Sequence, residues 1–197
     1  MEVRIVEMKK NEIDEVIAFH NKYLGKREFI NHDELEDRLD SKRGIFLVAK
    51  DEKENIVGIK LGYVEGPLCI GRGIAVDKKY RRMGIGKSLI EEFDNRLKEL
   101  GTVRQYIFAS DTKEGIPFHI SFGYKRILLA QFKEKDLGKK IKPKGYNISK
   151  MNLMKDLNCY QIFLNPKGNK VVDFEEFNKL KDLYPGIEIV LFFVKSV

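Results

Sequence analysis

The sequence of 197 residues has no tryptophan, and it has few cysteines and few histidines. Its two cysteines, Cys69 and Cys159, stand in apolar surroundings, which indicates buried, reduced thiols, and nothing in their number or spacing indicates a disulfide framework. Its three histidines, His20, His32 and His119, are not spaced from each other or from the cysteines as metal ligands are. We therefore expect no disulfide and no metal site.

Long apolar runs are also absent. The first five residues contain no apolar signal core, and the longest late run, residues 189–194, is too short to cross a bilayer. We therefore expect a soluble, cytoplasmic protein with no membrane partner.

Charged residues, in contrast, are plentiful. The chain has 43% hydrophobic and 34% charged residues, which is a globular and not a disordered composition. The formal net charge of +7 favours an anionic partner, such as a phosphorylated cofactor, a nucleic acid or an acidic protein. The densest basic stretch, residues 133–144, holds six lysines. We interpret it as a flexible, solvated loop, with a loop that binds RNA or an acidic partner as the alternative.

The apolar pattern predicts a mixed α/β fold with a central sheet. The order of its strands and helices is that of an α+β fold with a mixed sheet. Strands are expected over residues 2–8, 45–50, 56–64, 68–76, 103–109 and 124–132, and helices over 13–24, 33–39, 87–100 and 116–122. Asn31 is placed to cap the second helix, and Gly101 to end the third. Two glycines inside residues 68–76 indicate a bulge or a close approach of a ligand.

Beyond residue 132 the pattern predicts a C-terminal extension. A basic loop is followed there by a strand over 159–164, a helix over 174–184 and a strand over 187–194, which is a β-α-β-like order. We divide the chain into a core, residues 1–132, and this extension, residues 133–197. Whether the extension belongs to the same domain is left open.

The most informative stretch runs from Arg81 to Ser88 and reads Arg-Arg-Met-Gly-Ile-Gly-Lys-Ser. Its two glycines let a backbone come close to a ligand, because no Cβ blocks the approach. The helix that follows directs its unpaired N–H groups and the positive end of its dipole at this loop. With the cations of Arg81, Arg82 and Lys87, the stretch is typical of a cradle for a phosphate-rich ligand.

Three other binding motifs fail at one or two positions each. A Walker A loop needs a glycine where Arg81 stands, and a dinucleotide fingerprint needs its third glycine where Val76 stands. A calcium loop over residues 165–176 would have Lys167 at a ligand position and Lys170 in place of the required glycine. The phosphates are therefore not expected to be those of a nucleoside triphosphate or a dinucleotide.

Residues 73–90 resemble the central motif of the GCN5-related N-acetyltransferases, the GNAT family. The family signature is Arg or Gln, two residues, Gly, one residue, then Gly or Ala, and Arg81, Gly84 and Gly86 match it. The lead-in also matches, at Val76, Asp77 and Tyr80. A second family motif is similar to residues 117–126, and the layout of residues 1–132 resembles the family fold from its first strand to its sixth.

The resemblance implies acetyl-CoA as co-substrate, without a metal. The loop amides of residues 82–88 would bind the pyrophosphate, and an edge of the strand splayed open after Val76 would pair with the amides of the pantetheine arm. The residues assigned to the cofactor are Ile74, Ala75, Val76, Arg81, Arg82, Met83, Gly84, Ile85, Gly86, Lys87, Ser88 and Ser110.

The catalytic residues that the family often has are only partly present. The strand over 68–76 lacks the family's glutamate, and Glu65 at the preceding turn is the nearest carboxylate before it, with a solvated turn residue as its alternative role. His119 occupies the position of the family's tyrosine, the general acid for the departing thiolate. It could donate a proton near neutral pH, or it could be a packed or capping histidine.

Acceptor residues are harder to assign. The first two helices of the family usually wall the acceptor pocket, which makes Tyr23, Phe29 and His32 candidates beside surface or core roles. His20 lies on the apolar face of the first predicted helix, so we expect it in the core.

The sequence supports two functional hypotheses. The first is an N-acetyltransferase that moves an acetyl group from acetyl-CoA to a primary amine of a small molecule or protein. The alternative is a catalytically weak, GNAT-like binding module that uses a basic surface for CoA, RNA or a protein partner. A homodimer is left open in both.

Overall fold

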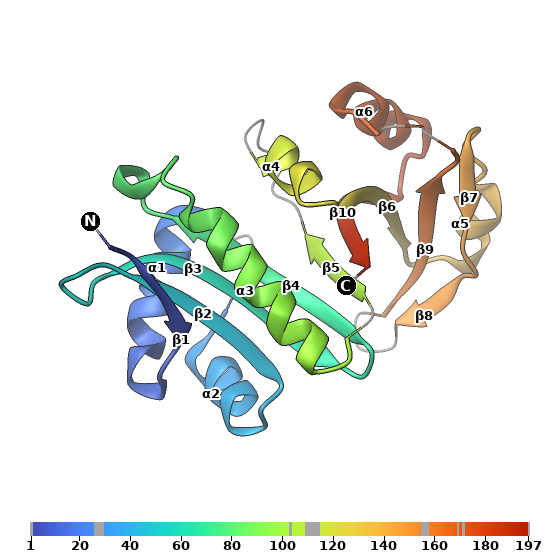
Figure 1. Cartoon of the computed structure of the whole chain (residues 1–197). Coiled ribbons are helices and arrows are strands. Elements are labelled where there is room, and N and C mark those ends of the chain that lie inside the picture. Colours follow the sequence, from blue (N-terminus) through green and yellow to red (C-terminus); the bar gives the residue numbers. More distant parts are fainter. Residues whose placement is uncertain are drawn as a thin grey trace. The chain divides into compact units, whose positions relative to one another are not determined.

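The computed structural model describes residues 2–25, 30–102, 104–108, 115–154, 158–168, 170 and 172–196. The chain divides into two compact units. The first comprises Met1–Phe108 with Lys195–Val197, and the second comprises Ala109–Val194 (Figure 1). The two units are described separately below.

The first unit is built on a five-stranded sheet. Its strands lie in the order β1-β2-β3-β4-β5. They are β1 (Arg4–Glu7), β2 (Gly44–Lys50), β3 (Ile56–Glu65), β4 (Leu68–Val76) and β5 (Arg104–Phe108). Neighbouring strands are antiparallel, except that β4 and β5 run parallel.

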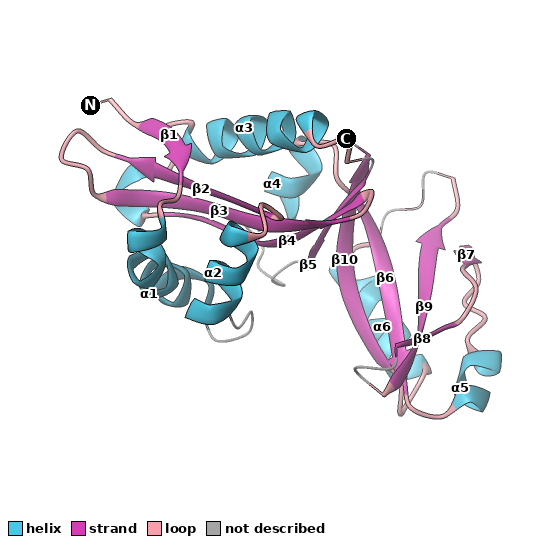
Figure 2. Cartoon of the chain, turned by 90° about the horizontal axis from the view of Figure 1, so that it is seen from below, coloured by secondary structure: helices cyan, strands magenta, loops and turns pink. Residues whose placement is uncertain are grey.

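Helices cover both faces of this sheet. Helices α1 (Ile13–Leu24) and α2 (His32–Asp40) lie on one face and α3 (Ile85–Glu99) on the other (Figure 2). Each face has its own apolar core, because side chains alternate along the strands: Val48 and Ile59 are buried under α1 and α2, and Leu47 under α3. Short 3-10 turns, η1 (Lys10–Glu12) and η3 (Lys78–Tyr80), precede α1 and α3.

The second unit has an antiparallel sheet in the order β10-β6-β9-β7, and β8 also pairs with β9. Its strands are β6 (Lys125–Phe132), β7 (Tyr146–Ile148), β8 (Asn152–Met154), β9 (Cys159–Pro166) and β10 (Glu188–Ser196). Its helices are α4 (Gly115–Ser121), α5 (Lys135–Lys140) and α6 (Phe174–Leu183).

Most of the expected elements are confirmed within a few residues, and the mixed α/β class with them. Asn31 caps α2, because its side-chain oxygen accepts from the backbone N–H of Glu34 at 2.7 Å. Gly101 follows the end of α3 with φ at +67°, as a C-terminal glycine does. Helix α3 begins at Ile85, two residues before the expected start at Lys87.

The basic stretch over 133–144 is a correction. The expected solvated loop is in fact the short helix α5 followed by buried residues, because Ile141 is only 1% exposed and Pro143 is buried. Its lysines are exposed as expected. Strand β6, which ends the predicted core, pairs with β9 and β10 of the predicted extension. Strand pairing thus crosses the boundary that we expect at residue 132, and the division into core and extension stays a prediction.

Three further expectations concern cysteines, metals and membranes. Cys69 is fully buried, Cys159 is half-buried, and both are free thiols. Burial raises the pKa of the Cys69 thiol to about 12. Among the described residues, no group of three or more acidic, histidine or cysteine side chains could hold a metal ion. No helix in the described part of the chain has the length and apolar character needed to cross a membrane.

Candidate functional site

Strand β4 carries a bulge at Arg72. On the paired strand β3, Leu61 faces Gly73 while the next residue, Gly62, faces Gly71, so Arg72 is an extra residue in the ladder. Gly73 has φ at +138°, a conformation that side-chain-bearing residues rarely adopt. The glycine pattern thus predicted the bulge correctly.

Helix α1 packs directly on this bulge. A Cβ at Gly73 would lie 2.5 Å from Leu24 Cδ1, so a side chain there would force Leu24 to shift. His20 Nε2 donates to the carbonyl oxygen of Arg72 at 3.2 Å. His20 is completely buried, which confirms its expected place in the core, and this burial lowers the pKa of its imidazole.

Beyond the bulge, β4 parts from β5. The two strands pair from Leu68 with Arg104 to Gly71 with Ile107, while β4 continues to Val76. On that side, no strand within the described ranges pairs with Ile74–Val76. We expected the opening after Val76, but it lies before Val76, along the residues assigned to the pantetheine arm. Unpaired backbone N–H and C=O groups at a strand edge can pair with amides of a ligand.

The loop between β4 and α3 has two residues in left-handed conformations. They are Arg82, with φ at +66°, and Gly84, with φ at +84°, and Gly84 occupies the N-cap position of α3. The amide of Ser88 donates to Gly84 O at 3.0 Å. The backbone N–H groups of residues 85–87 come before this first hydrogen bond of the helix. Helical geometry therefore gives them no acceptor within α3 and directs them toward the loop. The N-cap residue, a glycine, has no side chain that could cap α3, and the first turn of α3 holds no acidic residue.

The charges around this loop suit an anion. Arg81, Arg82 and Lys87 are exposed. Arg81 Nε donates to Val76 O at 3.2 Å, and Lys87 is 3.7 Å from Glu91 within the helix. A Cβ at Gly84 would meet nothing within 4 Å, so the approach to the helix end is open there. The helix end, the cations and the open approach fit a phosphate-bearing ligand such as the pyrophosphate of CoA.

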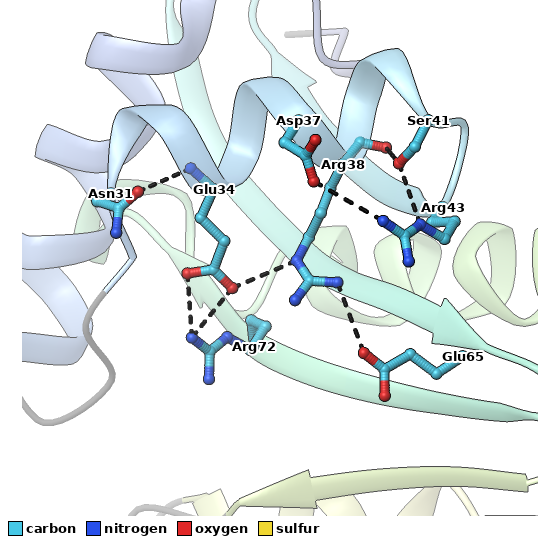
Figure 3. Close-up of polar contacts among 8 residues, drawn as sticks. All are labelled: Asn31, Glu34, Asp37, Arg38, Ser41, Arg43, Glu65 and Arg72. Atoms are coloured by element: carbon cyan, nitrogen blue, oxygen red, sulfur yellow. Dashed lines mark hydrogen bonds and ion pairs between the residues drawn. The ribbon is translucent and has the colours of Figure 1, made fainter. Parts of the chain in front are cut away.

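A second group of charges ties α2 to β3 and β4 (Figure 3). Glu34 accepts from Arg38 Nε at 3.3 Å and from Arg72 Nη2 at 3.4 Å. The Arg38 guanidinium lies 3.3 Å from the centre of the Tyr63 ring. These three charged side chains are each no more than 24% exposed, and one of them belongs to the bulge of β4. The sequence pattern contained no signal for the link from Glu34 to Arg72, because these residues are 38 positions apart in the chain.

Glu65 stands at the edge of the same network. Its carboxylate lies 4.0 Å from Arg38 Nη1, and its side chain is 54% exposed (Figure 3). It is the last residue of β3, and both of its roles, as a base and as a solvated residue, stay predictions.

The other acceptor candidates are anchored by carboxylates. The Tyr23 hydroxyl donates to Asp77 Oδ2 at 2.5 Å, which connects α1 to the loop before α3. His32 is half exposed and lies 2.9 Å from Asp14 Oδ1, a hydrogen bond that raises the pKa of its imidazole. Phe29 lies outside the described residues.

His119 belongs to α4, in the second unit. It is only 7% exposed, and its ring lies 5.4 Å from that of Tyr124 and 5.1 Å from that of Phe193. These contacts favour the packed alternative over the proton donor. Ser110 lies outside the described residues.

Comparison with known proteins supports the fold and the family. Residues 42–126 match the family model of the acetyltransferase (GNAT) domain. No curated protein matches the chain.

Solved structures with a similar fold include three bacterial enzymes. A GNAT-family acetyltransferase from Staphylococcus aureus Mu50 is 16% identical, with 99% of each chain covered and a TM-score of 0.54. A GNAT-family N-acetyltransferase from Escherichia coli, solved in complex with CoA, is 18% identical over 64% of this chain and 69% of its own, with a TM-score of 0.51. The ribosomal-protein-S18-alanine N-acetyltransferase of Escherichia coli is 12% identical over 87% of this chain and 100% of its own, with a TM-score of 0.52.

Proposed function

Because this chain carries a GNAT-family acetyltransferase domain, we propose that it transfers the acetyl group of acetyl-CoA to a primary amine of a small molecule or protein. One observation carries the proposal: an uncapped helix end with a basic loop follows directly on a strand whose edge is unpaired among the described residues. The two features suit the two halves of CoA, its pyrophosphate and its amide-bearing pantetheine arm. A similar solved structure was determined in complex with CoA.

The reaction is a direct attack in a ternary complex. The neutral amine attacks the thioester carbonyl, a C–N bond forms, the C–S bond breaks, and the CoA thiolate leaves. The amine loses one proton and the thiolate takes one up. The loop from Arg81 to Ser88 binds the pyrophosphate, and Ile74–Val76 align the pantetheine arm so that the thioester lies beside the acceptor.

The acceptor amine must lose its proton before it attacks. Deprotonating a lysine at pH 7 costs roughly 4–5 kcal/mol, while an α-amine costs only about 1 kcal/mol. Strand β4 contains no carboxylate; Glu65 is the nearest one before it along the chain, and Asp77 directly follows it. An α-amine acceptor needs the least help from a base, and it is our first choice for the acceptor class.

The cofactor half of the proposal is tested with Gly84→Asp. The substitution introduces a negative charge and a side chain at φ +84°, where an anion should bind. We expect calorimetry to show CoA binding to the native protein and binding at least about tenfold weaker to the variant. Equal binding by the two proteins would overturn the assignment of this loop.

The transfer half is tested by screening amines and peptides for release of the CoA thiol. Release that depends on an added amine supports the proposal, and its absence with every amine class opposes it. In the same assay, His119→Phe keeps an aromatic ring in the cluster with Tyr124 and Phe193 but cannot donate a proton. A turnover unchanged by this variant would remove the proposed role of His119 as general acid.

Glu65→Gln tests the proposed base. If Glu65 takes up the amine proton, the variant loses turnover most strongly with lysine-like acceptors, because these have the higher pKa. An equal effect on all acceptors, or none, would identify Glu65 as a solvated turn residue.

A binding module is the second candidate function. The observation that favours it is the row of exposed lysines in residues 133–144, which faces only two acidic residues of that stretch, Glu134 and Asp136. Such a module would bind RNA with an affinity that falls steeply with salt, and it would release no thiol with any amine.

A further inference from the structure

The segment that leads from β4 into the phosphate-binding loop begins at Asp77, and this carboxylate makes hydrogen bonds to two separate elements. Its Oδ2 accepts from the Tyr23 hydroxyl of α1 at 2.5 Å. Its Oδ1 accepts from the backbone N–H of Lys79 at 2.9 Å and so caps η3. The Asp77 amide donates to Val57 O at 2.9 Å, which fixes the same residue to β3. Asp77 therefore joins α1, β3 and the start of the loop.

A second carboxylate holds the other end of η3. Asp51, in the turn between β2 and β3, is only 7% exposed. Its Oδ2 accepts from the Tyr80 hydroxyl at 2.9 Å. Its Oδ1 accepts from the backbone amides of Lys53 and Asn55, each at 2.9 Å, so the turn itself fixes the carboxylate. Tyr80 thereby ties the loop to a rigid turn.

Only three residues separate Tyr80 from Gly84, and one of them, Arg82, has φ at +66°. A non-glycine residue keeps this unfavourable conformation only where the surrounding structure imposes it. The two anchors supply such a constraint on one side of Arg82, and α3 supplies it on the other. The loop is thus held in one conformation before any ligand binds, which reduces the entropy lost on binding.

We propose that Asp77 and Asp51 are positioning residues for the cofactor, which act through the hydroxyls of Tyr23 and Tyr80 to hold the loop in its phosphate-binding conformation. The inference rests on the proposed function, because the loop must bind CoA. It also assigns Tyr23, an acceptor-wall candidate from the sequence, to the cofactor side of the site.

The test uses the full chain with Tyr23→Phe, Tyr80→Phe and the double variant. Each change removes one hydroxyl and keeps the ring, so packing is preserved. The control is Tyr184→Phe, which removes a hydroxyl that accepts from the Lys142 amide at 3.3 Å in the second unit. Calorimetry with CoA gives affinities, thermal melting gives stabilities, and amide hydrogen exchange without ligand reports on the mobility of residues 81–88.

We expect each single variant to bind CoA about tenfold more weakly, the effect of losing one hydrogen bond to a charged group. The amides of residues 81–88 should exchange faster in these variants, and KM for acetyl-CoA should rise more than kcat falls. Tyr184→Phe should leave CoA affinity, the amide exchange of residues 81–88 and KM for acetyl-CoA unchanged, even if it lowers the melting temperature equally. A merely structural role would change melting without this selective loss of CoA affinity.

The possible failures are distinguishable. If the native protein binds CoA and the Tyr23 and Tyr80 variants bind it equally well, the positioning role is wrong and the proposed function stands. If the native protein does not bind CoA, both are wrong. Should a tyrosine variant fail to fold, Asp77→Asn and Asp51→Asn give the same measurement, because an amide keeps the shape and weakens the accepted hydrogen bond.

Discussion

At the scale of single residues, His20 makes stability depend on pH. Burial lowers the pKa of its imidazole, so between the folded and unfolded pKa values the unfolded chain binds more protons than the folded protein. Stability therefore falls as the pH drops below about 6.5, the pKa of an unperturbed histidine. We expect chemical denaturation to show a less stable protein at pH 5.5 than at pH 7.5, and His20→Gln to flatten this difference.

His32 provides the control for this prediction, because its effect has the opposite sign. Its pKa is raised by the hydrogen bond with Asp14, so its contribution to stability is present at low pH and is lost as the pH rises through the folded value. His32→Gln should therefore leave the acid-side loss in place or increase it slightly. A loss that persists unchanged in His20→Gln would contradict the assignment to His20.

Gly73 is the residue on which the contact between α1 and β4 depends. Alanine there would adopt φ +138° under strain, and its Cβ would press against Leu24 Cδ1 at 2.5 Å and His20 Nε2 at 3.4 Å. We expect Gly73→Ala to lower the free energy of unfolding by about 3 kcal/mol, measured by urea denaturation. Gly101→Ala is the matched control, since its φ is +67° and nothing lies within 4 Å of its Cβ. It should cost only the backbone strain, about 1 kcal/mol.

At the scale of secondary-structure elements, the sequence predicted those whose ends carry a local chemical signal. Asn31 and Gly101 mark helix ends through their own side chain or backbone, and both were found as expected. Helix α3 begins earlier than expected because Gly84, which has no side chain to cap it, occupies the N-cap position. The short strands β7 and β8, of three residues each, are too brief to show a period of two.

The candidate site likewise has one part that could be predicted from the sequence and one part that could not. The phosphate loop could be predicted because its glycines and cations are contiguous in the chain. The contacts that hold it could not, since Tyr23 and Asp77 are 54 residues apart and Tyr80 and Asp51 are 29 apart. Only tertiary folding brings such pairs together. The same holds for Glu34 and Arg72, which are 38 residues apart.

This last pair supports a prediction about α2 as a whole. Glu34 is shared by Arg38 of its own helix and Arg72 of β4 (Figure 3). Glu34→Gln leaves two partly buried guanidinium groups near each other without the carboxylate between them. We expect a loss of about 1–2 kcal/mol in the free energy of unfolding. On the same helix, Asp37→Asn removes an exposed ion pair with Arg43 at 3.7 Å and should cost under about 0.5 kcal/mol. Equal losses in the two variants would show that Glu34 does not tether the helix.

At the scale of the whole molecule, positive charge is concentrated in the second unit. Residues 109–194 hold 15 of the 37 Lys and Arg and 10 of the 30 Asp and Glu, so this unit carries +5 of the net +7. The phosphate loop, in contrast, belongs to the first unit. In the proposed site we expect CoA to be recognised by a few local groups, the amides of one helix end and the cations beside them, and not by the excess charge of the second unit.

The proposed site predicts how CoA binding responds to charge. In a variant with Lys133, Lys135, Lys140 and Lys142 changed to Gln, the formal net charge falls by four while residues 81–88 are untouched. We expect CoA affinity within about twofold of the native value at 0.15 M salt, because these lysines are not part of the proposed pyrophosphate cradle and salt screens exposed charges. Arg81→Gln removes a single charge inside the loop and should weaken CoA binding about tenfold. The reverse order of effects, in calorimetry at matched salt, would mean that the basic face of the second unit is the anion site and would favour the binding module over the enzyme.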